Sequence, residues 1–332
     1  MDSPLSEEKL QKAYMAEYGL ASEIDGIKIE GFDFSKPFDF KKFLESYKTT
    51  GFQASHLAIA IDIIKEMRKE KATIFLAYNS NMVSSGLREL IAFLAKNKMV
   101  HVLVTTAGGI EEDIMKTMGP FVLGSFGIEG KGLRKKGINR IGNILVANNR
   151  YIEFEAFMQK FLEKLYKKQK QTGKIITTSE FIMELGQEMN DEKSIYYWAA
   201  KNNIPCFCPP ITDGAIGDNI FFFKQKHPDF KLDISDDIVK IGALAINAEK
   251  SGIIVLGGGF VKHHVCNANL LREGADFAVY VTTETEEGGS DSGARPDEAV
   301  SWGKIKADGR MIKVYADATL VFPLIVAGAF LD

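Results

Sequence analysis

Residues 252–282 read GIIVLGGGFVKHHVCNANLLREGADFAVYVT, and this stretch decides the fold. The apolar runs at its two ends, 252–258 and 277–282, lack polar alternation, as strands buried on both faces of a sheet do. Between them a glycine turn opens a helical segment that contains His263 and His264. A strand, a helix and a second strand in this order build a parallel sheet with helices packed on its faces.

The same alternation continues on both sides of this stretch. Further apolar runs predict buried strands at 73–78, 100–106, 143–146, 205–212 and 312–317. Apolar residues at spacings of three and four predict helices within 54–71, 153–171 and 233–250. We interpret the basic stretch 160–174 as the solvated face of a helix. The sequence therefore predicts an α/β fold, with an N-terminal arm at 1–30 and a single domain at 31–332.

Composition excludes several classes of protein. The 332 residues include 41 basic and 44 acidic side chains, and 45% are hydrophobic. A disordered chain would be poorer in apolar residues, and a general nucleic-acid binder would be basic. The longest apolar run is about half of the ~20 residues that a membrane span needs, and the N-terminus resembles no targeting peptide. We expect a soluble, cytoplasmic protein with neither a nucleic-acid nor a membrane partner.

The three cysteines, Cys206, Cys208 and Cys266, are too few and too odd in number for a disulfide framework. They indicate a reducing compartment. Cys206 and Cys208 alternate in an apolar run, so both should face one side of a strand as buried thiols. A second ligand pair at zinc-site spacing is absent from the sequence, and we predict no metal site.

Polar, glycine-rich segments follow most of the predicted strands. In a parallel sheet these segments meet at the carboxyl edge, where ligands bind. Turns such as Gly108-Gly109 and Gly257-Gly258-Gly259 expose backbone N–H groups that can hold phosphates. Together they favour a dinucleotide site, although any one of them is equally explained as a tight turn between a strand and a helix.

Carboxylates accompany these turns. Six of them lie between residues 282 and 299, and more follow the neighbouring strands. Acidic side chains are also common at solvated helix starts. As a converging group, they indicate a pocket for a cation, either a divalent metal or an organic polyamine.

Two basic side chains are candidates for chemistry. Lys304 stands two residues after Trp302, so in an extended chain both would face the same way, and a partly desolvated lysine becomes a nucleophile. Alone, a lysine in this position is normally a surface residue. His263 shares a helical face with Asn267 and is a candidate general base. His264 should point elsewhere and be structural, because adjacent helical positions diverge by about 100°.

Several of these motifs occur together in one family. The runs GSDSGARPDEAVSWGKI (289–305), LGGGFVKHH (256–264), TTAGGIEED (105–113), ITDGAIGD (211–218) and IKVYADATLVFPL (312–324) resemble deoxyhypusine synthase. The resemblance extends over nearly the whole chain. It implies a Rossmann-like three-layer α/β/α domain without the G-x-G-x-x-G fingerprint. It also implies NAD-dependent transfer of the aminobutyl group of spermidine to one lysine of translation initiation factor 5A, with release of 1,3-diaminopropane.

The resemblance also assigns roles to residues. Lys304 would form the imine and His263 would assist deprotonation of the spermidine amine. The positions that match the family's NAD contacts are Ser80, Asn81, Ser84, Thr106, Ala107, Gly108, Glu112, Asp213, Gly258, Thr283, Asp317 and Ala318. Those that match its spermidine pocket are Glu112, Asp218, His263, Asn267, Gly289, Ser290, Asp291, Glu298, Trp302 and Lys304. The family assembles as homotetramers, dimers of dimers with active sites at the dimer interface.

Three other interpretations remain open at this point. The chain would be a non-catalytic regulatory paralogue, a homospermidine synthase-like aminobutyltransferase, or a nucleotide-binding scaffold without chemistry. The presence of Lys304, His263 and Trp302 favours an active enzyme. The chain departs from many family members at Gly288, where they have Asp. Residues 5–19 are expected to form a helix that covers an active-site entrance.

Overall fold

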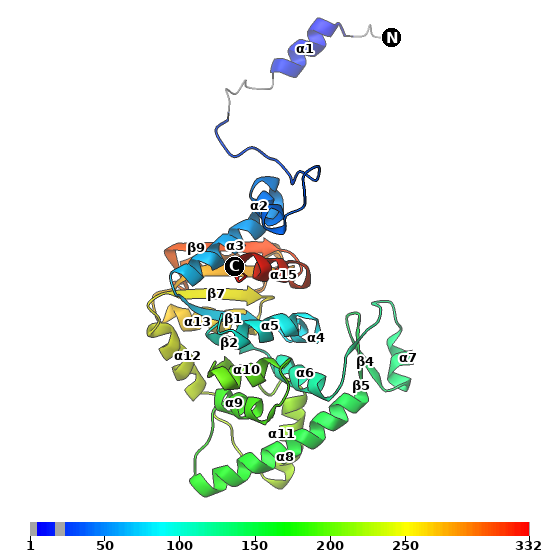
Figure 1. Ribbon diagram of the computed structural model, residues 1–332, viewed down its shortest axis with the longest axis vertical. Coiled ribbons are helices and arrows are strands. Elements are labelled where there is room, and N and C mark those ends of the chain that lie inside the picture. Colours follow the sequence, from blue (N-terminus) through cyan, green and yellow to red (C-terminus); the bar gives the residue numbers. More distant parts are fainter. Residues whose placement is uncertain (1–4, 17–23, 332) are drawn as a thin grey trace.

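The computed structural model describes residues 5–16 and 24–331, and Figure 1 shows its elements in chain order. The strands are β1 (Thr73–Tyr78), β2 (Val102–Thr105), β3 (Val122–Leu123), β4 (Ile138–Ile141), β5 (Ile144–Ala147), β6 (Cys206–Phe207), β7 (Ser251–Leu256), β8 (Ala275–Thr282) and β9 (Ile305–Tyr315). The helices before β6 are α1 (Glu7–Ala16), α2 (Phe40–Thr50), α3 (Phe52–Lys69), α4 (Asn81–Ser84), α5 (Leu87–Lys96), α6 (Ala107–Met118), α7 (Gly130–Lys135), α8 (Asn148–Thr172), α9 (Thr178–Glu188) and α10 (Ile195–Asn202). After β6 come α11 (Ala215–Lys226), α12 (Asp236–Ile246), α13 (Phe260–Leu270), the 3₁₀ turn η1 (Glu286–Gly288), α14 (Pro296–Ser301) and α15 (Ala318–Ala329).

The main sheet has six parallel strands in the order β6-β2-β1-β7-β8-β9. Counted along the chain, this is the order 3-2-1-4-5-6 of the doubly wound, Rossmann-type fold. The chain builds outward from β1 to one edge, returns to β7 beside β1, and then builds to the other edge. This confirms the predicted three-layer α/β/α architecture and places a switch point between β1 and β7.

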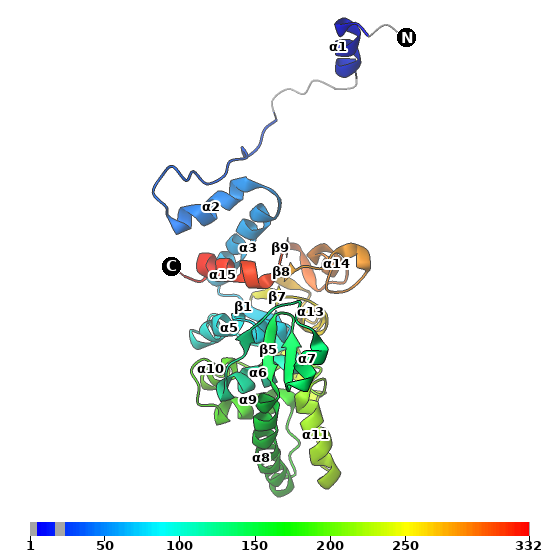
Figure 2. The ribbon, with the colours of Figure 1, turned by 90° about the vertical axis from the view of Figure 1, so that its right-hand side faces the viewer.

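Each central strand contributes side chains to two cores, because successive residues point to opposite faces. In β1, Ile74, Leu76 and Tyr78 belong to the larger core, whereas Phe75 and Ala77 belong to the smaller one. The larger core contains residues of α3, α5, α6, α10 and α15. The smaller core contains residues of α12, α13 and α14, and α13 and α14 lie on the same side of the sheet in Figure 2. Burial on both faces explains why these strands read as continuous apolar runs.

The apolar run at 143–146 does form a strand, but the prediction that it is a buried strand like the others was wrong. β5 lies in a separate antiparallel sheet of order β3-β5-β4, and within it only Val146 is buried. Gly142 and Asn143 form the two-residue turn of the β4–β5 hairpin, and Gly142 has a φ of +59°. Gly-Asn between two apolar runs predicts a hairpin, and this prediction conflicts with that of a buried strand. This sheet and α7 form an arm, residues 121–147, that projects beside the body (Figures 1 and 2).

Two other predicted strands differ in length from the structure. At 205–212 only Cys206 and Phe207 pair with β2, because the prolines on either side cannot extend an edge-strand ladder. Cys206 and Cys208 both face the larger core, as predicted, and all three cysteines are free and buried. The run predicted at 312–317 begins earlier, at Ile305, because the charged residues between 306 and 310 continue an edge strand.

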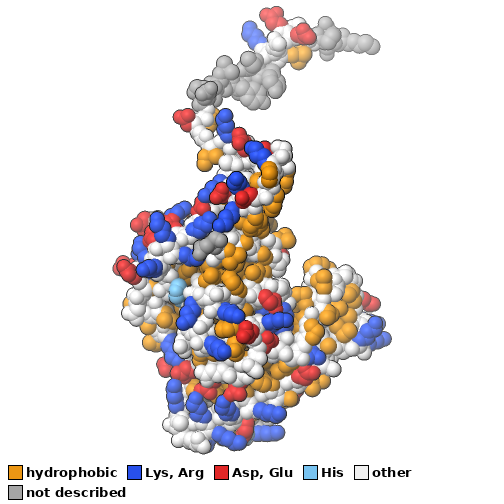
Figure 3. All heavy atoms as spheres, viewed as in Figure 1, with side chains coloured by type: hydrophobic (Ala, Val, Ile, Leu, Met, Phe, Trp, Pro, Cys, Tyr) orange, Lys and Arg blue, Asp and Glu red, His pale blue; other side chains and the backbone are white. Residues whose placement is uncertain are grey.

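The predicted helices all form. Helices α3, α8 and α12 cover the amphipathic stretches, and the basic stretch of α8 is a solvated face, as expected. Its lysines pair with acidic side chains of α8, α9 and the segment after α11, for example Lys170 with Asp229 at 2.9 Å and Lys168 with Glu184 at 2.5 Å. Figure 3 shows these charges gathered at the lower end of the molecule. Surface pairs of this kind contribute little to stability.

The N-terminal segment forms a helix within the stretch where one was expected. Helix α1 occupies Glu7–Ala16, whereas residues 17–19 of that expected helix lie outside the described part of the chain. The domain boundary after residue 30 stays a prediction. Among the residues that the structure describes, no helix is long and apolar enough to cross a membrane.

Candidate functional site

A cavity of about 1070 Å³ opens at the carboxyl ends of the parallel strands, at the predicted edge of the sheet. Segments that follow β1, β2, β6, β7, β8 and β9 all contribute to its wall. The ends of β1 and β7, which flank the switch point, provide Asn79 and Gly257. Ligands of doubly wound folds bind at this position because the crossovers leave in opposite directions and open a crevice there.

Eleven of the twelve predicted cofactor residues line this cavity. They are Ser80, Asn81, Ser84, Thr106, Gly108, Glu112, Asp213, Gly258, Thr283, Asp317 and Ala318. Ala107 belongs to the same turn as Thr106 and Gly108 but is fully buried and does not line the cavity. Residues separated by more than two hundred positions in the sequence therefore converge on one space.

Two glycines let backbone segments approach this cavity closely. A Cβ on Gly108 would lie 2.7 Å from Ser80 Cβ, and a Cβ on Gly258 would lie 2.4 Å from Ser292 Cα. Both distances are shorter than a real contact allows, so no larger side chain fits without movement of the neighbouring segment. Gly108 lies in the first turn of α6, whose N-cap Thr106 makes no side-chain capping bond. The free N–H groups of this turn face a space suited to an anion.

The cavity also contains carboxylates in unusual environments. Burial raises the pKa of Glu112 to about 7, although a short hydrogen bond donated by the Ser84 hydroxyl opposes this shift. Burial likewise raises the pKa of Glu111 to about 7. Glu111 accepts a 2.8 Å hydrogen bond from the backbone N–H of Ile216 and so caps the start of α11. A cationic ligand beside this pair would favour the ionised form of both groups.

Of the carboxylates expected to converge, Glu111, Glu112, Asp213 and Glu284 line the cavity, whereas Asp113 does not. Asp113 is fully buried and turns away from the cavity. It pairs with Arg88 Nε at 2.6 Å and accepts hydrogen bonds from Ser194 and the start of α10. Its helical position, one residue past Glu112, rotates it by about 100° into the protein.

A second group of predicted residues lies on the outer face of α13 and α14. His263 Nδ1 and Asn267 Nδ2 are 3.1 Å apart on α13. Lys304 Nζ lies 5.7 Å from the centre of the Trp302 ring, so the two side chains share a side as predicted. The chain between them is not extended, however, because Gly303 turns it with a φ of +70°. His264 is half-buried and burial lowers its pKa, which agrees with a structural role.

The remaining substrate candidates lie on the segment before α14, on α14 itself and on α11. Gly289, Ser290 and Asp291 follow η1 in the segment between β8 and α14, Glu298 is exposed on α14, and Asp218 lies in the first turn of α11. Asp291 Oδ2 is buried and accepts no hydrogen bond from the described residues. A buried carboxylate oxygen without a donor is costly, and an ammonium group would satisfy it.

Within one chain the two groups lie at different places on the sheet. The backbone oxygen of Lys304 accepts a hydrogen bond from the N–H of Ala275, the first residue of β8. Thr283, a cavity residue, follows the last residue of β8. Seven residue steps along a strand correspond to roughly 23 Å. The backbone of Lys304 and the cavity are therefore at opposite ends of β8.

The structure adds residues that the sequence did not indicate. Phe126, Ile141, Gly142, Asn143 and Ile144 of the projecting arm line the cavity. The predicted topology assigned 143–146 to the main sheet, so this contribution could not be expected; the Gly-Asn turn was the available signal. Lys262, next to His263, is buried, and although it lies within the run LGGGFVKHH (256–264) the sequence assigned it no role.

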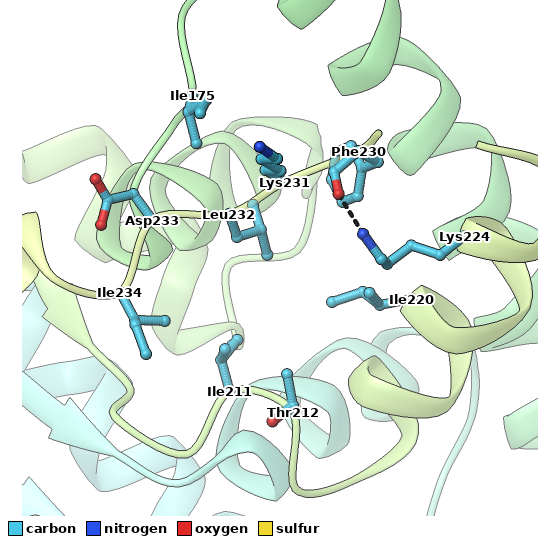
Figure 4. A pocket seen from close by; sticks show the side chains of 10 residues that line it. All are labelled: Ile175, Ile211, Thr212, Ile220, Lys224, Phe230, Lys231, Leu232, Asp233 and Ile234. Atoms are coloured by element: carbon cyan, nitrogen blue, oxygen red, sulfur yellow. Dashed lines mark hydrogen bonds between the residues drawn. The ribbon is translucent and has the colours of Figure 1, made fainter. Parts of the chain in front are cut away.

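A smaller pocket of about 410 Å³ contains none of the predicted residues (Figure 4). It lies between α11 and the segment 230–234, and its walls are mostly apolar. Lys224 bends across one side and donates a 2.6 Å hydrogen bond to the Phe230 carbonyl. Lys224 is therefore already bonded to the backbone. The cavity at the switch point remains the candidate site.

The strand order and the cavity together define a Rossmann-type α/β protein with a candidate ligand site at the switch point. The family model for deoxyhypusine synthase matches residues 42–329. The chain is 48% identical to deoxyhypusine synthase of Kluyveromyces lactis, covering 92% of both chains. It is 51% identical to the probable deoxyhypusine synthase of Methanocaldococcus jannaschii, covering 92% of this chain and 97% of that protein. The chain belongs to the deoxyhypusine synthase family.

A solved structure supports the same family. The crystal structure of a deoxyhypusine synthase homologue from Entamoeba histolytica is similar over 91% of this chain and 96% of that one, with a TM-score of 0.68 and 33% identity.

Proposed function

We propose that the chain is an NAD-dependent aminobutyltransferase that moves the 4-aminobutyl group of spermidine to one lysine of the translation initiation factor 5A precursor and releases 1,3-diaminopropane. One observation carries the proposal beyond family membership. Residues chosen from motifs scattered from Ser80 to Ala318 line a single cavity at the switch point of the sheet. Their convergence is what a dinucleotide site of this fold requires.

The residues of this cavity fit NAD. The first turn of α6 and the turn at Gly257–Gly259 would face the pyrophosphate with backbone N–H groups, and the side chains of Ser80 and Thr106 would add hydroxyl donors. The Gly108 and Gly258 positions exclude larger side chains from this wall. When bound, NAD supplies an acceptor for a hydride and later returns it.

The acidic side chains would hold the polyamine. Asp291, with its unpartnered buried oxygen, and the Glu111–Glu112 pair are the strongest candidates for contacts to its ammonium groups. Such contacts fix the position of the reacting carbon, and positioning supplies much of the rate. His263, held by Asn267, would accept the proton that the secondary amine loses during oxidation.

Lys304 would carry the aminobutyl group between donor and acceptor. After oxidation of the carbon–nitrogen bond, the Lys304 amine attacks the imine carbon and 1,3-diaminopropane leaves. The acceptor lysine then displaces Lys304 by the same exchange, and reduction of the product imine completes the cycle. Trp302 beside Lys304 would shield this step from water, which hydrolyses imines.

A second copy of the chain would complete the site. The outer face of α12 and α13 exposes large apolar side chains, at Ile238, Val239, Ile246, Phe260, Leu270 and Leu271. The two helices touch, since a Cβ on Gly242 would meet Leu271, so these side chains form one surface, which we call the α12–α13 face. Trp302, which is 66% exposed, lies near this face, since a Cβ on Gly303 would lie 3.4 Å from Leu270. An apolar surface of this kind marks an interface, and it would bring the substrate group of one chain to the cavity of another.

We further propose that the chain forms the homotetramer that the family resemblance implies, a dimer of such dimers. We also propose that it is located in the cytoplasm. Three free, buried cysteines are suited to a reducing compartment.

The decisive experiment uses the purified chain alone. Incubated with NAD, spermidine and the factor 5A precursor, it should label the factor and release 1,3-diaminopropane in equal amounts. Labelling only after addition of a paralogous chain would show that this chain is a regulatory partner. Faster transfer to putrescine than to the factor would show a homospermidine synthase-like activity, and NAD binding without transfer would leave only a scaffold.

A further inference from the structure

The segment between β8 and α14 has little apolar contact to hold it in place. Its residues from Thr283 to Ser290 are all exposed, and the first buried residues are Gly293 and Ala294. Yet this segment contains Ser290 and Asp291, two of the predicted substrate contacts, and its Ser292 packs against the glycine turn of the cavity. Its conformation must therefore depend on polar contacts.

Two lysines make those contacts from neighbouring elements. Lys262 on α13 donates hydrogen bonds from Nζ to the carbonyl oxygens of Asp291 and Ala294, the latter at 3.0 Å. Lys313 on β9 donates one to the carbonyl oxygen of Gly293. The segment is thus held through its backbone by one buried and one nearly buried ammonium group, from two different elements.

Lys262 stands out among the lysines of the chain because its side chain is only 3% exposed. A buried ammonium is costly unless its donors are used. Here two donors go to carbonyls, and the ammonium also lies 4.8 Å from the centre of the Tyr280 ring. Asp291 and Glu298 are the acidic groups near it, and Lys313 is the nearby basic one. The ammonium group of Lys262 thus binds the carbonyls of the segment between β8 and α14 rather than the carboxylate of an ion pair.

We propose that Lys262 is a positioning residue, which fixes the Asp291 carboxylate for the polyamine by clamping the backbone on either side of residues 292 and 293. The inference rests on the proposed function of the site. Lys262 also adjoins His263 in sequence, so one turn of α13 would carry both the candidate base and the clamp. A lysine that only stabilised the core would affect stability without a selective effect on polyamine binding.

The test compares Lys262→Met with Lys306→Met. Methionine keeps the length of the stem but removes the donors, and Lys306 is a matched control whose Nζ contacts Asp276 at the other end of the sheet. We expect Lys262→Met to increase hydrogen exchange of the amides in 286–294, with exchange in the central strands unchanged. It should raise the KM for spermidine in imine formation roughly tenfold, about the effect of one charge-assisted hydrogen bond, and change kcat and NAD affinity less than threefold.

Equal losses of spermidine and NAD affinity, or increased exchange without a change in KM, would overturn the proposal. If Lys262→Met does not fold, Lys313→Met tests the same segment from its more accessible side, with a smaller effect in the same direction. Unchanged exchange and unchanged KM in that variant would also overturn it. Failure of the wild-type chain to form an imine would contradict the proposed function instead, and the exchange measurement would still report on the clamp.

Discussion

The cofactor cavity and the α12–α13 face differ in how completely one chain builds them. The cavity is closed by segments from six strands, and its carboxylates Glu111 and Glu112 are buried. The α12–α13 face, with Trp302 beside it, presents large apolar side chains to solvent. A single chain thus builds the candidate cavity but leaves Lys304 and His263, the proposed nucleophile and general base, on an open surface. Under the proposed function, dinucleotide binding would therefore need one chain, whereas transfer would need the assembly.

The sharpest way to separate the two regions is to remove the nucleophile. Lys304→Ala should lower the rate of transfer by about 10³-fold or more, because it removes the amine proposed to form the covalent intermediate. NAD affinity should stay within twofold, since Lys304 is not among the residues that line the cavity. Borohydride trapping of labelled spermidine onto the chain measures the first effect, and titration with NAD measures the second. Lys306→Ala serves as the control, and trapping in the Lys304→Ala variant would contradict the assignment.

The α12–α13 face can be disrupted without a change to any predicted cofactor or substrate residue. Val239 is 69% exposed on α12, and Val239→Glu would place a charge in the proposed interface. We expect dissociation and a loss of transfer of about 100-fold at low protein concentration, partly recovered at high concentration. Sedimentation velocity and activity should be measured on the same samples. Val122→Glu, on the projecting arm, is the matched control because Val122 is also exposed. Full activity in a monomeric Val239→Glu variant would contradict the proposal that transfer needs a second chain.

A substitution in the wall of the cavity tests the other region of the molecule. Gly258→Ala adds a Cβ that would lie 2.4 Å from the Ser292 backbone, so either the glycine turn or the segment that contains Ser292 must move. We expect NAD affinity to fall roughly tenfold, the effect of one lost set of backbone contacts. Gly86→Ala is the control, because no atom lies within 4 Å of a Cβ at that position. Equal NAD affinity in both variants would show that the close approach at Gly258 does not shape the site.

The sequence predicted the cavity better than the face, and the reason is physical. Buried parallel strands are marked by runs such as 252–258, and their carboxyl ends must meet, so the residue pattern alone places Ser80, Thr106 and Gly258 together. The contact between Lys304 and Trp302 depends on the turn at Gly303, which the sequence did not specify. Lys262 lies within a run that resembles the family, but the sequence did not indicate its contacts, because they are made to carbonyls of a segment without regular structure. The arm was misplaced because an apolar run alone does not distinguish a hairpin strand from a buried one.

The smallest expected effect concerns the charge of the cavity itself. Burial raises the folded-state pKa of Glu112 from 4.5 to about 7, so the stability that this group contributes is fully present below pH 4.5 and is lost as the pH rises through 7. The melting temperature of the ligand-free protein should therefore fall across this range. Glu112→Gln should remove about 2–4 °C of that fall. Burial lowers the pKa of His101 and His264, which acts in the opposite direction, so only the difference between variant and wild type is informative. Glu249→Gln, an exposed control, should leave the pH profile unchanged, and an equally steep profile in Glu112→Gln would show that the carboxyl is not desolvated by the cavity wall.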